Sequence, residues 1–217
     1  MTGGFRVSPA NRMARQQHVS LVRTTWGIPE FSSPSTWDSV LGRLRELQYE
    51  AVEHCIGPFD CFQSDRALAN KLLTQHGLKS IGQLHTCGYP VSSRKVEDHV
   101  KSFSQLLELS KIAGVIFCNS HSGHDSWSLE ESLQFFREAE KIAHQAGVVV
   151  THETHRRRAL FSPWRSTEIM SALPELRITA DLSHWAVVAE RIFEDAADAE
   201  WFAFISCVFR YSAARTR

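Results

Sequence analysis

The chain has 217 residues, enough for one sizeable domain or two small ones. Apolar residues make up 43% of it and charged residues 22%, which is the composition of an ordinary globular protein. Its 24 basic and 24 acidic residues cancel, which argues against a protein that grips nucleic acid through a broad basic face. We therefore expect no nucleic-acid partner.

Cysteine usage and the two ends of the chain bear on its location. Five cysteines, none in a CxxC pair, favour reduced thiols inside the cell. The longest apolar run, 201–209, is too short to cross a bilayer, so we expect a cytoplasmic protein without a membrane partner. Residues 1–17 carry three arginines and no acid, which favours a disordered basic arm. A mitochondrial transit peptide has the same composition, so a mitochondrial location stays open.

Apolar, strand-like segments alternate with amphipathic, helical segments along the chain. The predicted strands lie at 18–26, 49–57, 79–85, 114–121, 148–153 and 177–182. The predicted helices cover 34–48, 64–77, 93–113 and 128–147, a fifth contains Ile169, Met170 and Leu173, and a sixth begins near Val187. The strands therefore end about every 30 residues, which is typical of βαβ units with a parallel sheet.

Helix boundaries carry their own signals. Ser35 is the predicted N-cap of the first helix, and Ser128 with Glu131 has the spacing of a capping box. Gly77 is the predicted stop of the second helix. Along the third helix, the apolar side is predicted to include Ile112 together with Val96, Val100, Phe103, Leu106 and Leu107.

The strand–helix alternation predicts an α/β fold, an incomplete (β/α)8 TIM barrel with about six β/α units. An open nucleotide-binding sheet is the alternative, but no GxGxxG follows the first strand and no P-loop lysine is present. A complete barrel needs two more units and about 250 residues, so we expect a chain truncated after its sixth unit. We divide it into a basic arm (1–17), a partial barrel domain (18–193) and an atypical C-terminal tail (194–217). The alternative to truncation is a genuine short variant that closes its core through this apolar tail.

Two of the predicted strands carry a carboxylate at or next to their last residue, Glu153 and Asp181. Neighbouring parallel strands lie about 4.8 Å apart, so these side chains are close enough to share one divalent cation. Carboxylate and imidazole ligands suit Mn, Mg, Co or Zn. The alternative is structural: the two acids cap helix N-termini or pair with the arginines at 156–158.

Histidines follow the same strand ends. His184 lies three residues after Asp181, where a tight loop would turn it back toward the same pocket as a ligand or a substrate contact. His85 and His121 end the third and fourth strands and are candidate substrate-binding residues, although each is equally well read as a core histidine. A role for either one depends on the pocket that the strands build.

The remaining candidates are weaker. Strand alternation points His152 away from Glu153, toward the helix layer. His155 and His124 lie in loops, and we assign them no role. Glu53 on the second strand is either a pocket carboxylate or a buried acid paired with an arginine.

Together these motifs resemble the xylose isomerase-like TIM-barrel superfamily, which holds sugar isomerases, ketose 3-epimerases and apurinic endonucleases. The resemblance runs over about residues 18–193 and rests on WGIP, VEHC, His85, NSHSG, THETH and ADLSHW. It implies that Glu153 is a metal ligand that also does acid–base work, and that Asp181 is the next ligand. By the same resemblance, His184 contacts substrate or zinc, and His121 matches the fourth-strand histidine of the endonuclease-type sites. The family also uses a histidine from strand seven and a glutamate from strand eight, which this chain lacks.

We therefore expect a sugar isomerase/epimerase-like protein. It would use a divalent metal for proton transfer next to the carbonyl of a small carbohydrate or hydroxy-acid substrate. A catalytically inactive truncated barrel is the first alternative, and a zinc-dependent phosphodiesterase of the apurinic endonuclease type is the second. Assembly as a homo-oligomer stays open.

Overall fold

Six parallel strands form one sheet in sequence order, β1-β2-β3-β4-β5-β6. The computed structural model describes residues 20–192. The strands are β1 Val22–Thr24, β2 Ala51–Cys55, β3 Lys79–His85, β4 Phe117–His121, β5 Val150–Glu153 and β6 Ile178–Thr179. The helices are α1 Pro34–Glu46, α2 Arg66–Gln75, α3 Val96–Ala113, α4 Leu129–Ala146, α5 Pro163–Ala172 and α6 Leu182–Ala189, with short 3-10 turns η1 Pro29–Ser32 and η2 Gln63–Asp65.

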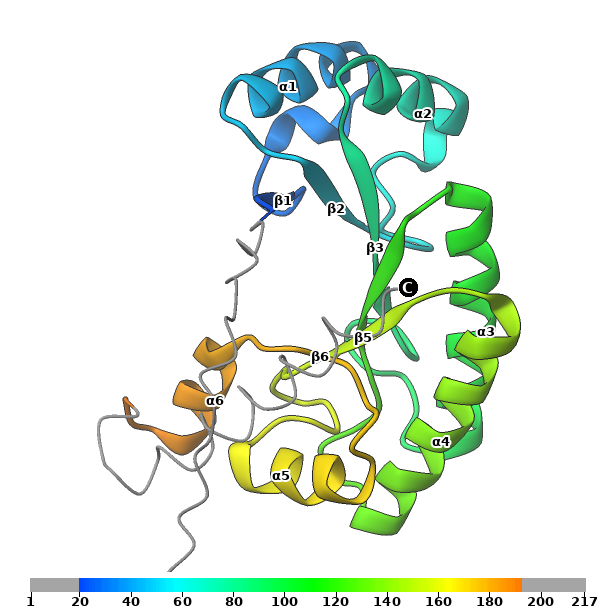
Figure 1. Ribbon diagram of the computed structural model, residues 1–217, viewed down its shortest axis with the longest axis vertical. Coiled ribbons are helices and arrows are strands. Elements are labelled where there is room, and N and C mark those ends of the chain that lie inside the picture. The colour runs from blue at the N-terminus through cyan, green and yellow to red at the C-terminus, as the bar shows by residue number, and fades with distance from the viewer. Residues whose placement is uncertain (1–19, 193–217) are drawn as a thin grey trace, which may run out of the picture.

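The sheet curls into half of a barrel, and α3 and α4 cover part of its convex side (Figure 1). Each pair of neighbouring strands is parallel and consecutive in the chain, as repeated βαβ units require. The prediction of an α/β fold with six β/α units of a TIM barrel is therefore confirmed for residues 20–192. The predicted basic arm (1–17) and the predicted tail (194–217) lie outside the described residues.

Helix boundaries follow the capping signals in most places. Ser128 caps α4 in a complete capping box with Glu131, as predicted. The predicted N-cap Ser35 is wrong, because Ser33 occupies that position and Pro34 begins α1. Proline is pre-organised for the first helical position, where its missing N–H costs nothing.

Two further helix predictions are wrong. Ile112 is 73% exposed, because the buried face of α3 runs through Phe103, Leu107 and Ser110 and leaves Ile112 on the solvent side. The last helix begins at Leu182 and not near Val187, since the Asp181 side chain accepts a hydrogen bond from the Ser183 backbone and so caps α6. Strand β6 is correspondingly short.

The core lies between the sheet and its helices in two buried clusters, one against α1 and α2 and one against α3, α4 and α5. His152 is fully buried in the second cluster, with its ring 4.9 Å from that of Phe136 and 6.2 Å from that of Phe103. The prediction that His152 points to the helix layer is therefore confirmed. None of the described helices has the length and apolar character needed to cross a membrane.

Gly123 offers a sharp test of the packing behind the strand ends. Its φ is +72°, and a Cβ there would overlap the Trp127 ring and lie 2.9 Å from the Ala159 Cβ. We expect Gly123→Ala to lower the free energy of unfolding by about 2–4 kcal/mol, from left-handed strain plus overpacking. Gly147→Ala is the matched control, because its φ is +68° but nothing lies within 4 Å, so it should lose only about 1–2 kcal/mol. Urea unfolding followed by circular dichroism checks this, and equal losses would contradict it.

The burial of His99 is expected to make the folded protein less stable in acid. It is buried, with Nε2 2.9 Å from the Ser93 carbonyl and Nδ1 2.7 Å from Thr86 Oγ1, and burial lowers its pKa to about 4. The unfolded chain takes up this proton near pH 6.5, so the stabilisation is complete above pH 6.5 and is lost as pH falls toward 4.

We expect the drop in unfolding free energy between pH 7 and pH 4.5 to be about 1–2 kcal/mol smaller in His99→Gln than in the wild type. The measurement is urea unfolding at both pH values. The exposed His144→Gln serves as control and should keep the wild-type drop. An unchanged drop in His99→Gln would show that other groups govern the acid response.

Candidate metal centre

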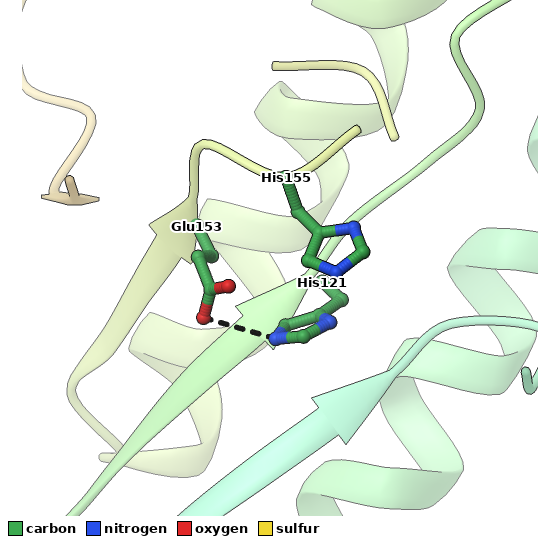
Figure 2. A group of neighbouring side chains, drawn as sticks. All are labelled: His121, Glu153 and His155. Carbon is green, nitrogen blue, oxygen red and sulfur yellow. Dashed lines mark hydrogen bonds and ion pairs between the residues drawn. The ribbon is translucent and has the colours of Figure 1, made fainter. Parts of the chain in front are cut away.

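His121, Glu153 and His155 meet at the carboxyl ends of β4 and β5 (Figure 2). His121 is the last residue of β4, and Glu153 is the last of β5, so the parallel sheet delivers both to one edge. His121 Nε2 lies 2.9 Å from Glu153 Oε2. One ligand atom from each of the three side chains lies within 4.8 Å of the others, and all three side chains are buried.

A second trio shares the same glutamate: Glu153, Asp181 and His184, again with ligand atoms within 4.8 Å of one another. His184 was expected in a tight loop but lies in the first turn of α6, three residues after the capping Asp181. Residues three apart share one side of a helix, which brings His184 Nε2 to 3.8 Å from Asp181 Oδ2. The rings of His184 and His155 are 3.9 Å apart, so the two trios adjoin.

His85 belongs to neither trio. It ends β3, and its ring lies 4.4 Å from the ring of His121 and 6.2 Å from that of Tyr89. The structure therefore brings His85 to the same edge as the other four predicted residues, one ring away from Glu153.

Two residues at this edge were not predicted from the sequence as site residues. Asn119 lies two residues before His121 on β4, hence on the same strand face, which was the available signal. Its Nδ2 donates to Glu153 Oε2 at 2.5 Å and to Glu53 Oε1 at 3.2 Å, which joins the two carboxylates. The other residue is His155, set aside as a loop residue. The Glu53 carboxylate accepts a hydrogen bond from the Asn119 amide, and no arginine forms an ion pair with it among the described residues.

Burial sets the protonation of these groups. It lowers the pKa of His121 and of His85 to about 3 and that of His155 to about 4, so all three imidazoles are neutral at pH 7. Burial also raises the pKa of Glu153, and the hydrogen bond from Asn119 opposes this without cancelling it. Burial on its own would raise the pKa of Asp181, but hydrogen bonds from Ser183 and the nearby His184 outweigh it and lower that pKa overall.

The donor set fits a divalent metal ion. Neutral imidazoles and carboxylates are borderline-to-hard ligands, suited to Zn, Mn, Co or Mg. Ligand bonds of about 2.0–2.2 Å place two ligand atoms of one ion at most about 4.4 Å apart. The ligand atoms of each trio all lie within 4.8 Å of one another, so small side-chain movements would bring them onto one ion. His121 Nδ1 and Asn119 Oδ1 are buried and have no hydrogen-bond partner in the described part of the chain. Such orphaned atoms commonly mark a missing ion, water or ligand.

The alternative that Glu153 and Asp181 only cap helices or pair with arginines holds in part for Asp181. Asp181 does cap a helix, with Oδ1 2.9 Å from Ser183 N, but its Oδ2 remains turned toward His184. The arginines at 156–158 form no ion pair with Glu153 or Asp181 among residues 20–192. Arg158 instead donates to the carbonyl oxygens of Thr86 and Gly88.

Several solved structures resemble this chain at low sequence identity. A sugar phosphate isomerase/epimerase from Parabacteroides distasonis matches with a TM-score of 0.59 and 15% identity, over 82% of this chain and 70% of that one. A xylose isomerase-like TIM barrel protein from Mycobacterium smegmatis in complex with magnesium matches with a TM-score of 0.59 and 13% identity, over 85% and 71%. The probable 3-DHS dehydratase AsbF from Bacillus anthracis matches with a TM-score of 0.55 and 15% identity, over 79% and 66%.

At these identities the structural likeness shows the fold alone, and the chain spans about two thirds of the length of those proteins. A comparison with curated protein sequences gave no significant match. The sequence model described as xylose isomerase-like TIM barrel, however, matches residues 41–207, which is most of the chain. The protein belongs to the xylose isomerase-like TIM barrel family.

Proposed function

We propose that this protein is a sugar isomerase/epimerase-like enzyme that moves a proton next to the carbonyl of a small hydroxylated substrate, with the help of a divalent metal ion. The observation that carries the proposal is the position of Glu153, a buried carboxylate common to both ligand trios. The similarity to a sugar phosphate isomerase/epimerase and to an L-ribulose 3-epimerase supports the reaction class. The magnesium complex of another similar protein supports the use of a divalent ion.

Glu153, Asp181 and His184 would hold the ion, with His121 and His155 as further donors on the other side of Glu153. When bound there, a divalent ion supplies Lewis-acid polarisation of a substrate carbonyl or hydroxyl oxygen. His85 would then line the substrate side of the centre, one ring beyond His121. The substrate itself would be a small carbohydrate or a hydroxy acid.

Glu153 would also carry the proton. Asn119 Nδ2 and His121 Nε2 both lie against Oε2, which fixes the carboxylate plane and leaves Oε1 without a hydrogen bond among the described residues. Oε1 would accept the proton from the substrate carbon and return it. Burial raises the pKa of Glu153 toward the working pH, where a general base is most effective.

Metal binding is the first test. We expect Mn2+ or Co2+ to raise the melting temperature of the wild-type protein, and at 100 times Kd the gain is worth about 2.7 kcal/mol. The combined Glu153→Gln and Asp181→Asn variant should lose this gain, because two anionic ligands are gone. Glu46→Gln removes an exposed acid at the far end of α1 and should keep it. Equal stabilisation of wild type and double variant would place the ion elsewhere.

Proton transfer is the second test, read as deuterium incorporation from D2O beside the carbonyl of a ketose panel by NMR. Loss of a positioned general base costs about 10²–10⁴-fold in rate, so Glu153→Gln should fall to background while Glu46→Gln exchanges normally. Metal binding without any exchange by the wild type would favour a catalytically inactive barrel instead.

Zinc-dependent phosphodiester cleavage is a second candidate, favoured by the histidine-rich trio around His121 and His155. The balanced charge of the chain speaks against it. Incubation of the zinc-loaded protein with an abasic DNA duplex separates the two: strand cleavage that Glu153→Gln abolishes would replace the isomerase proposal.

A further inference from the structure

A cavity of about 310 Å³ lies at the carboxyl edge of the sheet, outside the two ligand trios. Loops that follow three different strands line it: Tyr89 after β3, His124 and Asp125 after β4, and Arg157 and Arg158 after β5. Its volume is in the range of small-molecule binding sites, larger than one phosphoryl or carboxylate group needs.

Arg158 places a buried positive charge in the wall of this cavity. Only 1% of the residue is exposed, and Nη1 and Nη2 donate to the carbonyl oxygens of Thr86 and Gly88 at 2.7 and 2.8 Å. Burial lowers its pKa to about 10, so the guanidinium remains charged at pH 7. The carbonyls orient the group but carry no charge, and Arg158 has no carboxylate in an ion pair among residues 20–192. A buried cation without an anion is costly unless a partner arrives.

Arg157 adds an exposed positive charge to the same cavity. Its φ of +64° lies in the left-handed region, which costs a non-glycine residue about 1–2 kcal/mol. Its side chain forms no ion pair with any residue that the structure describes. Backbone strain of this kind gathers at ligand-binding positions, where it is tolerated for function.

The net charge of the lining is positive. Asp125 is the single acid, 3.1 Å from His124 Nδ1. Burial lowers the pKa of His124, so that histidine is neutral at pH 7 and does not add a third positive charge. Two arginines and one aspartate therefore leave one positive charge for a ligand to neutralise.

We propose that this cavity binds an oxyanion, a phosphate monoester or a carboxylate, carried by the substrate of the adjacent metal centre. Guanidinium groups recognise both anions through paired N–H donors. Three neighbouring rings connect the two sites: the ring centroid of Tyr89, which lines the cavity, lies 6.2 Å from that of His85, and the centroid of His85 lies 4.4 Å from that of His121. A hydroxylated substrate would thus span from its acidic group at the arginines to its carbonyl at Glu153. The link to the substrate rests on the proposed function, whereas anion binding does not.

The test is calorimetric titration of metal-free, dialysed protein with inorganic phosphate, D-ribose 5-phosphate, D-gluconate and uncharged D-ribose. Removing one charged donor costs about tenfold in affinity, so Arg157→Gln should bind phosphate about tenfold more weakly than wild type. Asp125→Asn should bind it several-fold more tightly, because it removes the repelling acid. The matched control Arg156→Gln changes a neighbouring exposed arginine that does not line the cavity, and should bind within about twofold of wild type.

Ribose 5-phosphate or gluconate should bind at least about tenfold better than ribose, and the tighter of the two identifies phosphate or carboxylate as the natural group. The titrations use metal-free protein, so failure of the metal centre would not remove this site. The proposal is overturned if Arg157→Gln binds like wild type, if Arg156→Gln weakens binding equally, or if no anion binds better than ribose.

Discussion

The parallel register between β4 and β5 is the constraint on which the rest of the centre depends. It pairs Ser120 with His152, so the next residues along each strand, His121 and Glu153, emerge side by side at the carboxyl edge, 2.9 Å apart. A slip of β5 by one residue would turn Glu153 to the opposite face of the sheet and bring one of its neighbours beside His121 instead. His152 holds the register from behind, because its buried ring packs against Phe136 in the helix layer. The fold therefore fixes the geometry of the centre before any ligand binds.

Electrostatic cost is concentrated at the same edge. Glu53 and Glu153 are two carboxylates facing one amide, Asn119, and the pKa of each is raised first by burial and further by nearby carboxylates. Such an arrangement costs stability, since buried acids lose hydration and repel each other. A cation at Glu153, and an anion at Arg158 on the far side of the histidines, would each supply the missing counter-charge. Both proposals thus explain the same observation. The buried carboxylate of Glu153 and the buried guanidinium of Arg158 lie close together, yet they do not form an ion pair with each other.

Much of the architecture was predictable from the sequence because the strand and helix periods are local properties. The strands ending at His85, His121 and Glu153 follow directly from apolar runs that stop at polar residues, and α4 follows from its capping box. His155 was not predictable: the chain folds back after β5, with His155 N 2.9 Å from the Glu153 carbonyl, and that turn has no glycine or proline to announce it. The start of α6 at Leu182 was not predicted either, because Asp181 serves both as the cap of this helix and as a site residue.

The central claim is that Glu153 and Asp181 hold one divalent ion at the strand ends. Anomalous diffraction from a crystal of the wild-type protein soaked in Mn2+ tests it most directly. The account predicts a peak about 2.0–2.3 Å from a carboxylate oxygen of each residue, with an imidazole nitrogen of His184 or His121 completing the contacts. An anomalous peak at any other place, or no peak at this edge at saturating Mn2+, would contradict it.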